Sequence, residues 1–328
     1  VVHFDATGSV VRKPYNIYCK RIMYYALVMK KGESIISIAE MITSEHDILS
    51  ISILLKRKWP FFKVVVVDWS WALINSLMNE WNRCNIREYL ERIYSSLDKG
   101  TPIEDTLLIV HTCCAHFMKR VSSYIQKKFP KCIEIKTFLL ECVAIMLMST
   151  QFILLDEIFE EFITILLKPE EEKSQINIIR LNQLRIKAGI SDRTDFEENR
   201  EDEEEEEEEK KEDENQDFEY ENVFINKKNE GRIFNASPFF RRYNYKYVHL
   251  KERIQESDNI TNKYYNPEIA EYITYKLMPF VPMWSSILLS QIVPNVARLS
   301  NAYVESYFNV VKKDILQGQV NLKIGRFI

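Results

Sequence analysis

A run of four consecutive valines, 64–67, constrains the fold of this chain more than any other feature. The branched side chain of Val favours extended backbone, because it packs well on a pleated surface. Successive side chains of a strand point to opposite faces of the sheet, so an unbroken valine run predicts burial on both faces. We therefore predict an interior strand over 62–68, in a sheet that helices cover on both sides.

The segments around this run predict the order of an α/β sandwich. Further strands are predicted at 1–5, 23–29, 35–42 and 106–111. Helices are predicted from 48 to before Trp59, twice within 69–97, and after His116 to about 129. The resulting order is three strands, helix, strand, helix, strand, helix. It is the order of a ribonuclease-H-like fold, in which an antiparallel meander comes first and later strands add in parallel.

The remainder of the chain is mainly helical in character. The most apolar segment, 138–155, contains Glu141 and Gln151, so we predict buried helices there rather than a membrane span. A helix is predicted over 267–277, ended by the prolines that follow it. The last helix is predicted over 300–317, with Ser300 as its N-cap and Gly318 as its stop. Helical spacing predicts one apolar face for it, made by Val304, Phe308, Val311 and Ile315.

The formal charge of −4 conceals a strong asymmetry. Between Glu197 and Glu221 there are 17 acidic and 3 basic residues, a net charge of −14, so the rest of the chain carries +10. An acidic tract at about 191–231 cannot bury a core, and we predict that it is disordered. The basic remainder favours a polyanionic partner. Six cysteines without a secretory signal indicate a reducing compartment and not a disulfide scaffold.

Three carboxylates stand at positions that suit metal binding. Asp5 and Asp68 each end a predicted strand, and Glu305 lies on the polar face of the last helix. Each one alone has an ordinary interpretation, since Asp is a common turn former and a helical Glu is commonly solvated. Together they match the needs of two-metal phosphoryl transfer, in which hard oxygen ligands hold two Mg²⁺ or Mn²⁺ ions.

Four segments carry a resemblance to a known family. They are His3-Phe4-Asp5-Ala6-Thr7-Gly8, Val67-Asp68-Trp69-Ser70, Cys113-Cys114-Ala115-His116-Phe117 and Ser300-Asn301-Ala302-Tyr303-Val304-Glu305-Ser306-Tyr307. In this order they resemble the Asp, Asp, Cys-x-x-His, Glu signature of Mutator-like transposases, especially the Foldback-type branch. The resemblance covers nearly the whole chain as a DDE catalytic domain. It implies that Asp5, Asp68 and Glu305 form the metal-binding catalytic triad.

The resemblance also implies an organisation. A ribonuclease-H-like core would occupy 1–130 and return at 291–328, around a helical insertion at 131–290 that contains the acidic tract. The DNA-end-binding domain expected upstream is not in the sequence, and the chain starts within a strand without Met, which predicts a fragment or a trimmed product. The implied activity is Mg²⁺- or Mn²⁺-dependent cleavage of transposon-end DNA and transfer of the 3′-hydroxyl into target DNA. A nuclear homodimer or higher oligomer with no membrane or small-molecule partner is expected.

Two other functions are compatible with these residues. The first is a domesticated, catalytically silent DNA-binding protein of the same fold. The second is another ribonuclease-H-like nuclease, acting on RNA or on branched DNA.

Cys113 and His116 match the Cys-x-x-His element of the family. Both residue types bind zinc, but a structural zinc site takes four ligands, and no second Cys or His pair lies at suitable spacing. We therefore favour a packing and hydrogen-bonding role for this element near the active site.

Several basic and polar residues are candidates for DNA contact, because cations neutralise phosphates and aromatic rings stack on bases. They are Lys119, Arg120, Arg241, Arg242, Lys246, Asn301, Lys312 and Lys313. Trp284 is a weaker candidate for stacking on an unpaired base, and core packing is its main interpretation.

Overall fold

Five strands form one mixed sheet in the computed structural model, which describes residues 1–8, 22–56, 62–129, 132–190, 237–254, 259–293, 296 and 298–316. The strands are β1 (Val2–Thr7), β2 (Met23–Lys31), β3 (Ser34–Thr43), β4 (Val64–Val67) and β5 (Ile109–Thr112). Their order is β3-β2-β1-β4-β5. The first three strands pair antiparallel, whereas β4 pairs parallel with both β1 and β5. The predicted meander followed by parallel strands is confirmed.

The valine run is the interior strand that its composition predicts. All four side chains of β4 are fully buried, and the strand has a hydrogen-bonded neighbour on each edge. The helices of this part of the chain are α1 (Ile48–Leu55), α2 (Trp71–Leu77), α3 (Ile86–Lys99), α4 (Cys114–Lys128) and α14 (Ala302–Val310). Two of them continue as π-helical turns, α2 into η1 (Met78–Asn82) and α14 into η5 (Val311–Ile315). The α/β class is therefore confirmed.

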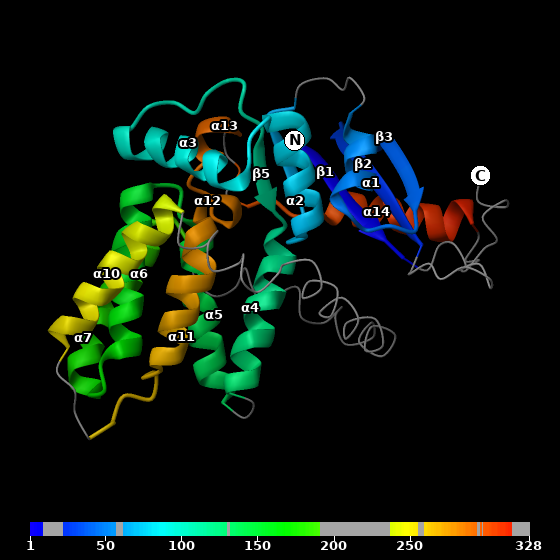
Figure 1. Cartoon of the computed structure of the whole chain (residues 1–328). Helices are drawn as coiled ribbons and strands as arrows, with labels where there is room; N and C mark the ends of the chain where they lie inside the picture. Colours follow the sequence, from blue (N-terminus) through cyan, green and yellow to red (C-terminus); the bar gives the residue numbers. More distant parts are fainter. Residues whose placement is uncertain are drawn as a thin grey trace. The chain divides into compact units, whose positions relative to one another are not determined.

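Helix α14 packs on one face of the sheet through the apolar stripe that its spacing predicts. Val304, Phe308 and Val311 contact side chains of β2 that alternate along the strand and so share one face: Tyr24, Ala26 and Val28. In Figure 1 this helix, in red, lies against the blue strands. The helix begins one residue later than predicted, with Asn301 rather than Ser300 at the N-cap position. Gly318 lies outside the described residues.

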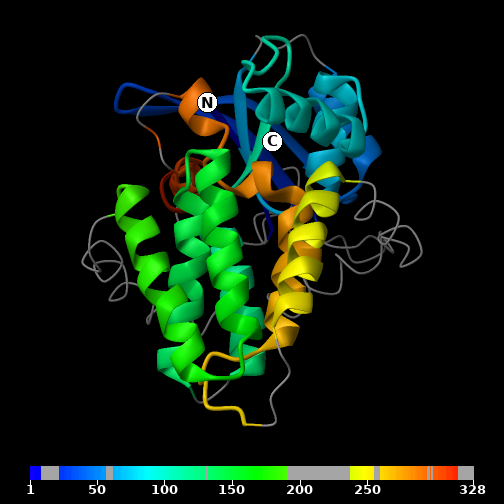
Figure 2. The same cartoon turned by 90° about the vertical axis from the view of Figure 1, so that its left-hand side faces the viewer.

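A second group of helices forms a separate compact unit. It contains α5 (Ile133–Met148), α6 (Phe152–Leu167), α7 (Glu171–Lys187), α10 (Pro238–Arg253) and α11 (Pro267–Tyr272), which continues into the π-helical η3 (Ile273–Leu277). Helix α6 packs against α5, α7, α10 and α11, and Figure 2 shows these helices side by side. The apolar segment 138–155 is divided between α5 and α6. Among the described residues, no helix is long and apolar enough to cross a membrane.

The predicted helix over 267–277 ends at Leu277, but the prolines that follow do not stop the helical backbone altogether. A 3-10 turn, η4 (Met278–Phe280), and a short helix, α12 (Val281–Trp284), follow directly, each with Pro in its first turn. Pro is tolerated there because the first N–H groups of a helix have no partner within it. Each proline therefore restarts the helix. The described chain continues through α13 (Leu289–Ile292).

Two compact units are thus defined. The sheet unit comprises Val1–Val121, Pro282–Trp284 and Gln291–Ile328, and the helical unit comprises Ser122–Val281 and Ser285–Ser290. The first division falls within α4, before the predicted boundary at 130. The predicted acidic tract, about 191–231, lies within 191–236, outside the described residues.

Candidate functional site

The parallel pairing of β1 and β4 brings the two aspartates together. Phe4 is in register with Val67, so the residues that follow them, Asp5 and Asp68, lie next to each other where this pairing ends. Asp68 follows β4 as predicted, whereas Asp5 does not end its strand, because β1 continues to Thr7 through its pairing with β2. Asp5 is buried and accepts a hydrogen bond from the N–H of Ala6 at 2.7 Å. Two carboxylates from distant parts of the sequence therefore share one edge of the sheet.

The surroundings shift the pKa values of the two aspartates in opposite directions. Burial, and then the charge of Asp68, raise the pKa of Asp5 well above its ordinary value of 3.8. Burial also acts to raise the pKa of Asp68, but the hydrogen bond and charge of His116 outweigh it, and the pKa of Asp68 falls below 3.8. A carboxylate beside a second carboxylate in a buried position is an arrangement that a bound cation stabilises.

His116, in the first turn of α4, lies between two carboxylates. Its Nδ1 is 2.6 Å from Asp68 Oδ1, and its Nε2 is 3.7 Å from Glu305 Oε1. Burial acts to lower the pKa of His116, but Asp68 and Cys113 outweigh it and raise this pKa to about 12. The imidazole is therefore a cation at neutral pH, and it links the aspartate of β4 to the glutamate of α14.

Asn301 joins the same cluster from the start of α14. It is fully buried, and its side-chain Nδ2 donates a hydrogen bond to Asp68 Oδ1 at 3.1 Å. Its backbone N–H donates to Cys113 Sγ at 3.2 Å. Glu305 follows in the first turn of the helix, half exposed, and its N–H donates to the carbonyl of Asn301 at 3.0 Å. The predicted triad and the Cys-x-x-His element thus belong to one constellation of the sheet unit.

The donor types of the cluster suit two kinds of metal ion, but the structure brings only one of the two sets within 4.8 Å among the described residues. The carboxylates of Asp5, Asp68 and Glu305 are of the type that binds hard cations such as Mg²⁺ or Mn²⁺, but their oxygens do not all lie within 4.8 Å of one another. The Sγ of Cys113, a ring nitrogen of His116 and a carboxylate oxygen of Asp68 do lie within 4.8 Å of one another, a mixed set that suits zinc. Sequence reasoning sought a second Cys or His pair and missed Asp68 as the third member of this set.

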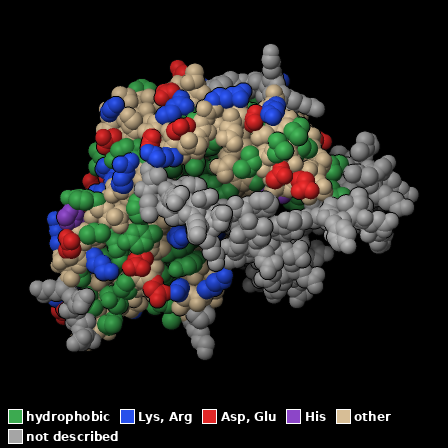
Figure 3. All heavy atoms as spheres, viewed as in Figure 1, with side chains coloured by type: hydrophobic (Ala, Val, Ile, Leu, Met, Phe, Trp, Pro, Cys, Tyr) green, Lys and Arg blue, Asp and Glu red, His purple; other side chains and the backbone are tan. Residues whose placement is uncertain are grey.

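The residues predicted to contact DNA are found in different environments. Lys119, Arg120 and Lys313 are exposed in the sheet unit, Lys312 is half-buried, and Arg120 lies over the ring of Trp69, 5.7 Å from its centroid. Asn301 is buried in the carboxylate cluster instead of being presented on the surface. On the face in Figure 3, basic and acidic side chains are interspersed, as around α3, where Arg87 pairs with Glu91.

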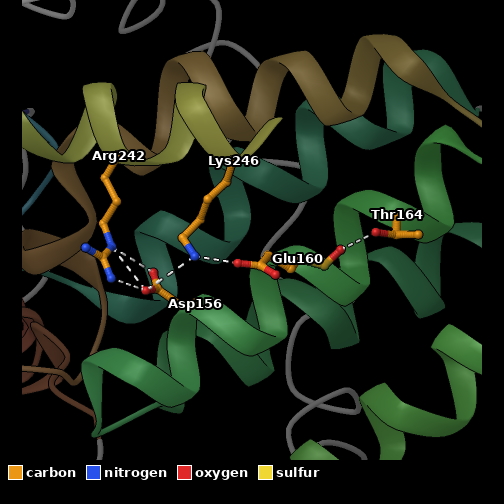
Figure 4. Close-up of polar contacts among 5 residues, drawn as sticks. All are labelled: Asp156, Glu160, Thr164, Arg242 and Lys246. Atoms are coloured by element: carbon orange, nitrogen blue, oxygen red, sulfur yellow. Dashed lines mark hydrogen bonds and ion pairs between the residues drawn. The ribbon is translucent and has the colours of Figure 1, made fainter. Parts of the chain in front are cut away.

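The remaining candidates lie in the helical unit, on α10. Arg241 is exposed. Figure 4 shows that Arg242 and Lys246 point toward α6 instead, where Arg242 pairs with Asp156 and Lys246 pairs with both Asp156 and Glu160. These two cations have carboxylate partners within the helical unit. Their predicted role in DNA contact stays a prediction.

Trp284 packs in the core, in agreement with the main interpretation of its sequence position. Its side chain is fully buried and stacks on Phe117, with ring centroids 4.6 Å apart.

Comparison with known proteins gives one informative relationship. No family model matches the chain, and no solved structure matches it. Over 325 residues, 95% of this chain, it is 25% identical to the "120.7 kDa protein in NOF-FB transposable element" of Drosophila melanogaster. The chain spans 28% of the length of that relative. The sheet unit with its cluster of carboxylates thus belongs to a chain that is similar to a protein encoded by a transposable element.

Proposed function

We propose that this chain contains the catalytic domain of a DDE-type transposase with a ribonuclease-H-like fold, of the Mutator-like family and its Foldback-type branch. The observation that carries the proposal is the register of β1 with β4, which sets Asp5 beside Asp68. The strand order, the third carboxylate on a late helix and the transposable-element relative support it. The activity, substrates and partners of the whole protein are part of the proposal.

Asp5, Asp68 and Glu305 would hold two Mg²⁺ or Mn²⁺ ions. Bound divalent ions would lower the pKa of an attacking water or 3′-hydroxyl and stabilise the leaving oxyanion. Asp5 lies within β1, Asp68 follows β4 and Glu305 lies on α14, so packed elements would fix the positions of the three carboxylates. Without metal, His116 provides positive charge to Asp68 and Glu305. The substrates would be transposon ends and target DNA in the nucleus, handled by at least a dimer because two ends are processed.

A strand-cleavage assay on labelled duplex and supercoiled plasmid DNA, in Mg²⁺ or Mn²⁺, tests the proposal. Removal of one charged metal ligand removes several kcal/mol of transition-state stabilisation, so Asp68→Asn is expected to cleave at least about 100-fold more slowly. The matched control is Asp105→Asn, which changes an exposed carboxylate of the sheet unit that pairs with Lys63. Equal cleavage by wild type and Asp68→Asn would overturn the proposal.

A further inference from the structure

Two residues of the cluster, Cys113 and Asn301, have no role in the proposed chemistry. Cys113 contributes no carboxylate, and Asn301 is an uncharged side chain buried at the start of α14. Yet these two residues connect three elements: the strand end that carries Asp68, the start of α4 and the helix that carries Glu305.

The start of α14 is built in an unusual way. Asn is among the preferred N-cap residues, because its side-chain oxygen accepts a hydrogen bond from a free N–H of the first helical turn. Asn301 occupies the N-cap position, but its side chain makes no such bond. Its amide donates to Asp68 instead, at 3.1 Å. The helix thus lacks a side-chain cap at its N-terminus, and the Asn301 side chain instead donates to Asp68, the candidate metal ligand.

The backbone of Asn301 is held from the other side. Its N–H donates to the buried thiol of Cys113 at 3.2 Å, and the next residue, Cys114, donates its own N–H to the carbonyl of Leu299 at 2.9 Å. Two hydrogen bonds therefore tie the segment before α14 to the start of α4. Because these bonds fix the backbone of Asn301, its side-chain amide is held in the direction of Asp68.

We infer that Asn301 is a positioning residue, and that Cys113 holds it so that Asp68 and Glu305 keep a fixed geometry for divalent metal. Since Asn301 lies four residues before Glu305 in the same helix, its hydrogen bond to Asp68 relates two ligands that are 237 positions apart in the sequence. Outer hydrogen bonds to metal ligands commonly matter 10–100-fold for metal affinity or activity. This inference rests on the proposed function, since it assigns a role toward the same metal site.

The competing explanation is a zinc site made by Cys113, His116 and Asp68, whose donor atoms lie within 4.8 Å of one another. Each of the three already has a partner in the protein. The thiol accepts from Asn301, and Asp68 accepts from Asn301 and contacts His116. These bonds account for the arrangement without an ion, so positioning is the inference that the contacts favour.

The decisive variant is Asn301→Ser. Ser is a good N-cap, so the helix start is retained, but its short side chain cannot reach Asp68. We expect Mn²⁺ affinity, measured by equilibrium dialysis or by electron paramagnetic resonance, to fall about 10–100-fold. In the cleavage assay kcat should fall at subsaturating Mn²⁺ and recover at high Mn²⁺, with the KM for DNA unchanged. Asn309→Ser, the same substitution at an exposed position of α14, is the matched control.

A second pair of variants tests the role of the thiol. Cys113→Ser keeps a hydrogen-bond acceptor for the Asn301 N–H, whereas Cys113→Ala does not. We expect Cys113→Ser to lose less Mn²⁺ affinity than Cys113→Ala. Stoichiometric zinc in the purified wild type that is absent from Cys113→Ser would overturn the inference in favour of a zinc site.

The outcomes separate this inference from the proposed function. If wild type binds Mn²⁺ and cleaves DNA, and Asn301→Ser matches it in both, the positioning role is overturned and the proposed function stands. If wild type binds Mn²⁺ without cleaving, the proposed function fails, and a loss of binding in Asn301→Ser still supports the positioning role. If wild type neither binds nor cleaves, both are overturned.

Discussion

Neighbouring carboxylates have different charge partners in the two units. In the helical unit, Asp156 and Glu160 lie one turn apart on α6 and meet Arg242 and Lys246, which lie one turn apart on α10 (Figure 4). The negative charges there are matched one for one. In the sheet unit, Asp5 and Asp68 face each other, and among the described residues His116 is the cation in contact with Asp68.

This difference bears on the proposed function. A buried carboxylate with a matched cation and good hydrogen bonds is compatible with stability alone. Adjacent carboxylates in a partly buried position oppose folding, and such perturbed groups are common at functional sites. The charge pairs of the helical unit hold helices together, whereas the carboxylate pair of the sheet unit is the one that we propose to bind metal.

The largest expected effect comes from breaking a matched pair. Arg242→Ala removes the bidentate partner of buried Asp156 and leaves it the longer contact with Lys246, at 3.6 Å. Loss of one member of a buried pair typically costs about 3–5 kcal/mol, and the free energy of unfolding, measured with urea, should fall by up to that amount because Lys246 remains. Lys187→Ala, which breaks the exposed pair with Glu157, is the control and should cost less than about 1 kcal/mol. Similar losses in both variants would contradict the comparison.

The next largest effect is the rise in Tm when a divalent metal ion binds at Asp5 and Asp68. A ligand at 100 times its Kd stabilises the folded state by about 2.7 kcal/mol, so Mg²⁺ or Mn²⁺ should raise the Tm of wild type. Substitution of both Asp5 and Asp68 by Asn should abolish this rise, and Asp105→Asn should retain it. The measurement is thermal unfolding across a metal titration. An equal rise in the double variant would place the metal elsewhere.

The smallest expected effect is a gain in the free energy of unfolding when the negative charge of Asp5 is removed. Without divalent metal, Asp5→Asn should be more stable than wild type at pH 7, by about 0.5–2 kcal/mol, the range common for relief of a destabilised site. The sign follows from the raised pKa of Asp5. A carboxyl that binds its proton more tightly in the folded state contributes stability below pH 3.8 and loses it as pH rises through the folded pKa.

Urea unfolding at a series of pH values checks this. The gap between Asp5→Asn and wild type should widen as the pH rises above about 4. A variant that is less stable than wild type at pH 7 would show that Asp5 contributes to folding in the way that Asp156 does.

The sheet could be predicted from the sequence because its strands carry strong local signals. Four valines in a row have few alternatives to a buried strand, and the stripe of Val304, Phe308 and Val311 identified the buried face of α14. The prolines at 279 and 282 marked the end of the predicted helix but gave no sign of the short helical turns after it, because the same residue can both end one helix and start the next. The local sequence therefore predicted where helices and strands occur better than it predicted where each one ends.

The site was less accessible to sequence reasoning. The sequence predicted Asp68 correctly at the end of a strand, but it also put Asp5 at a strand end, although β1 continues to Thr7. The roles of His116 and Asn301 depend on contacts across the fold. Asn301 looked like a polar surface residue because helical spacing places it beside Glu305. Only the packing of the helix start against Cys113 turns it inward. A polar residue at a helix start gives no local signal that separates a cap from a contact with a distant carboxylate.

The contact between Asp68 and Asn301 also has a consequence for biosynthesis. The two residues are separated by 233 positions, and the sheet unit is interrupted in the sequence by the helical unit. At about 5–20 residues per second, a ribosome needs roughly 10–50 s to travel from one to the other. During that interval β1 and β4 can pair, but α14 does not yet exist to cover β2 or to bring Glu305. A nascent chain therefore has no complete cluster, and any cleavage activity would begin only after the last helix has been made.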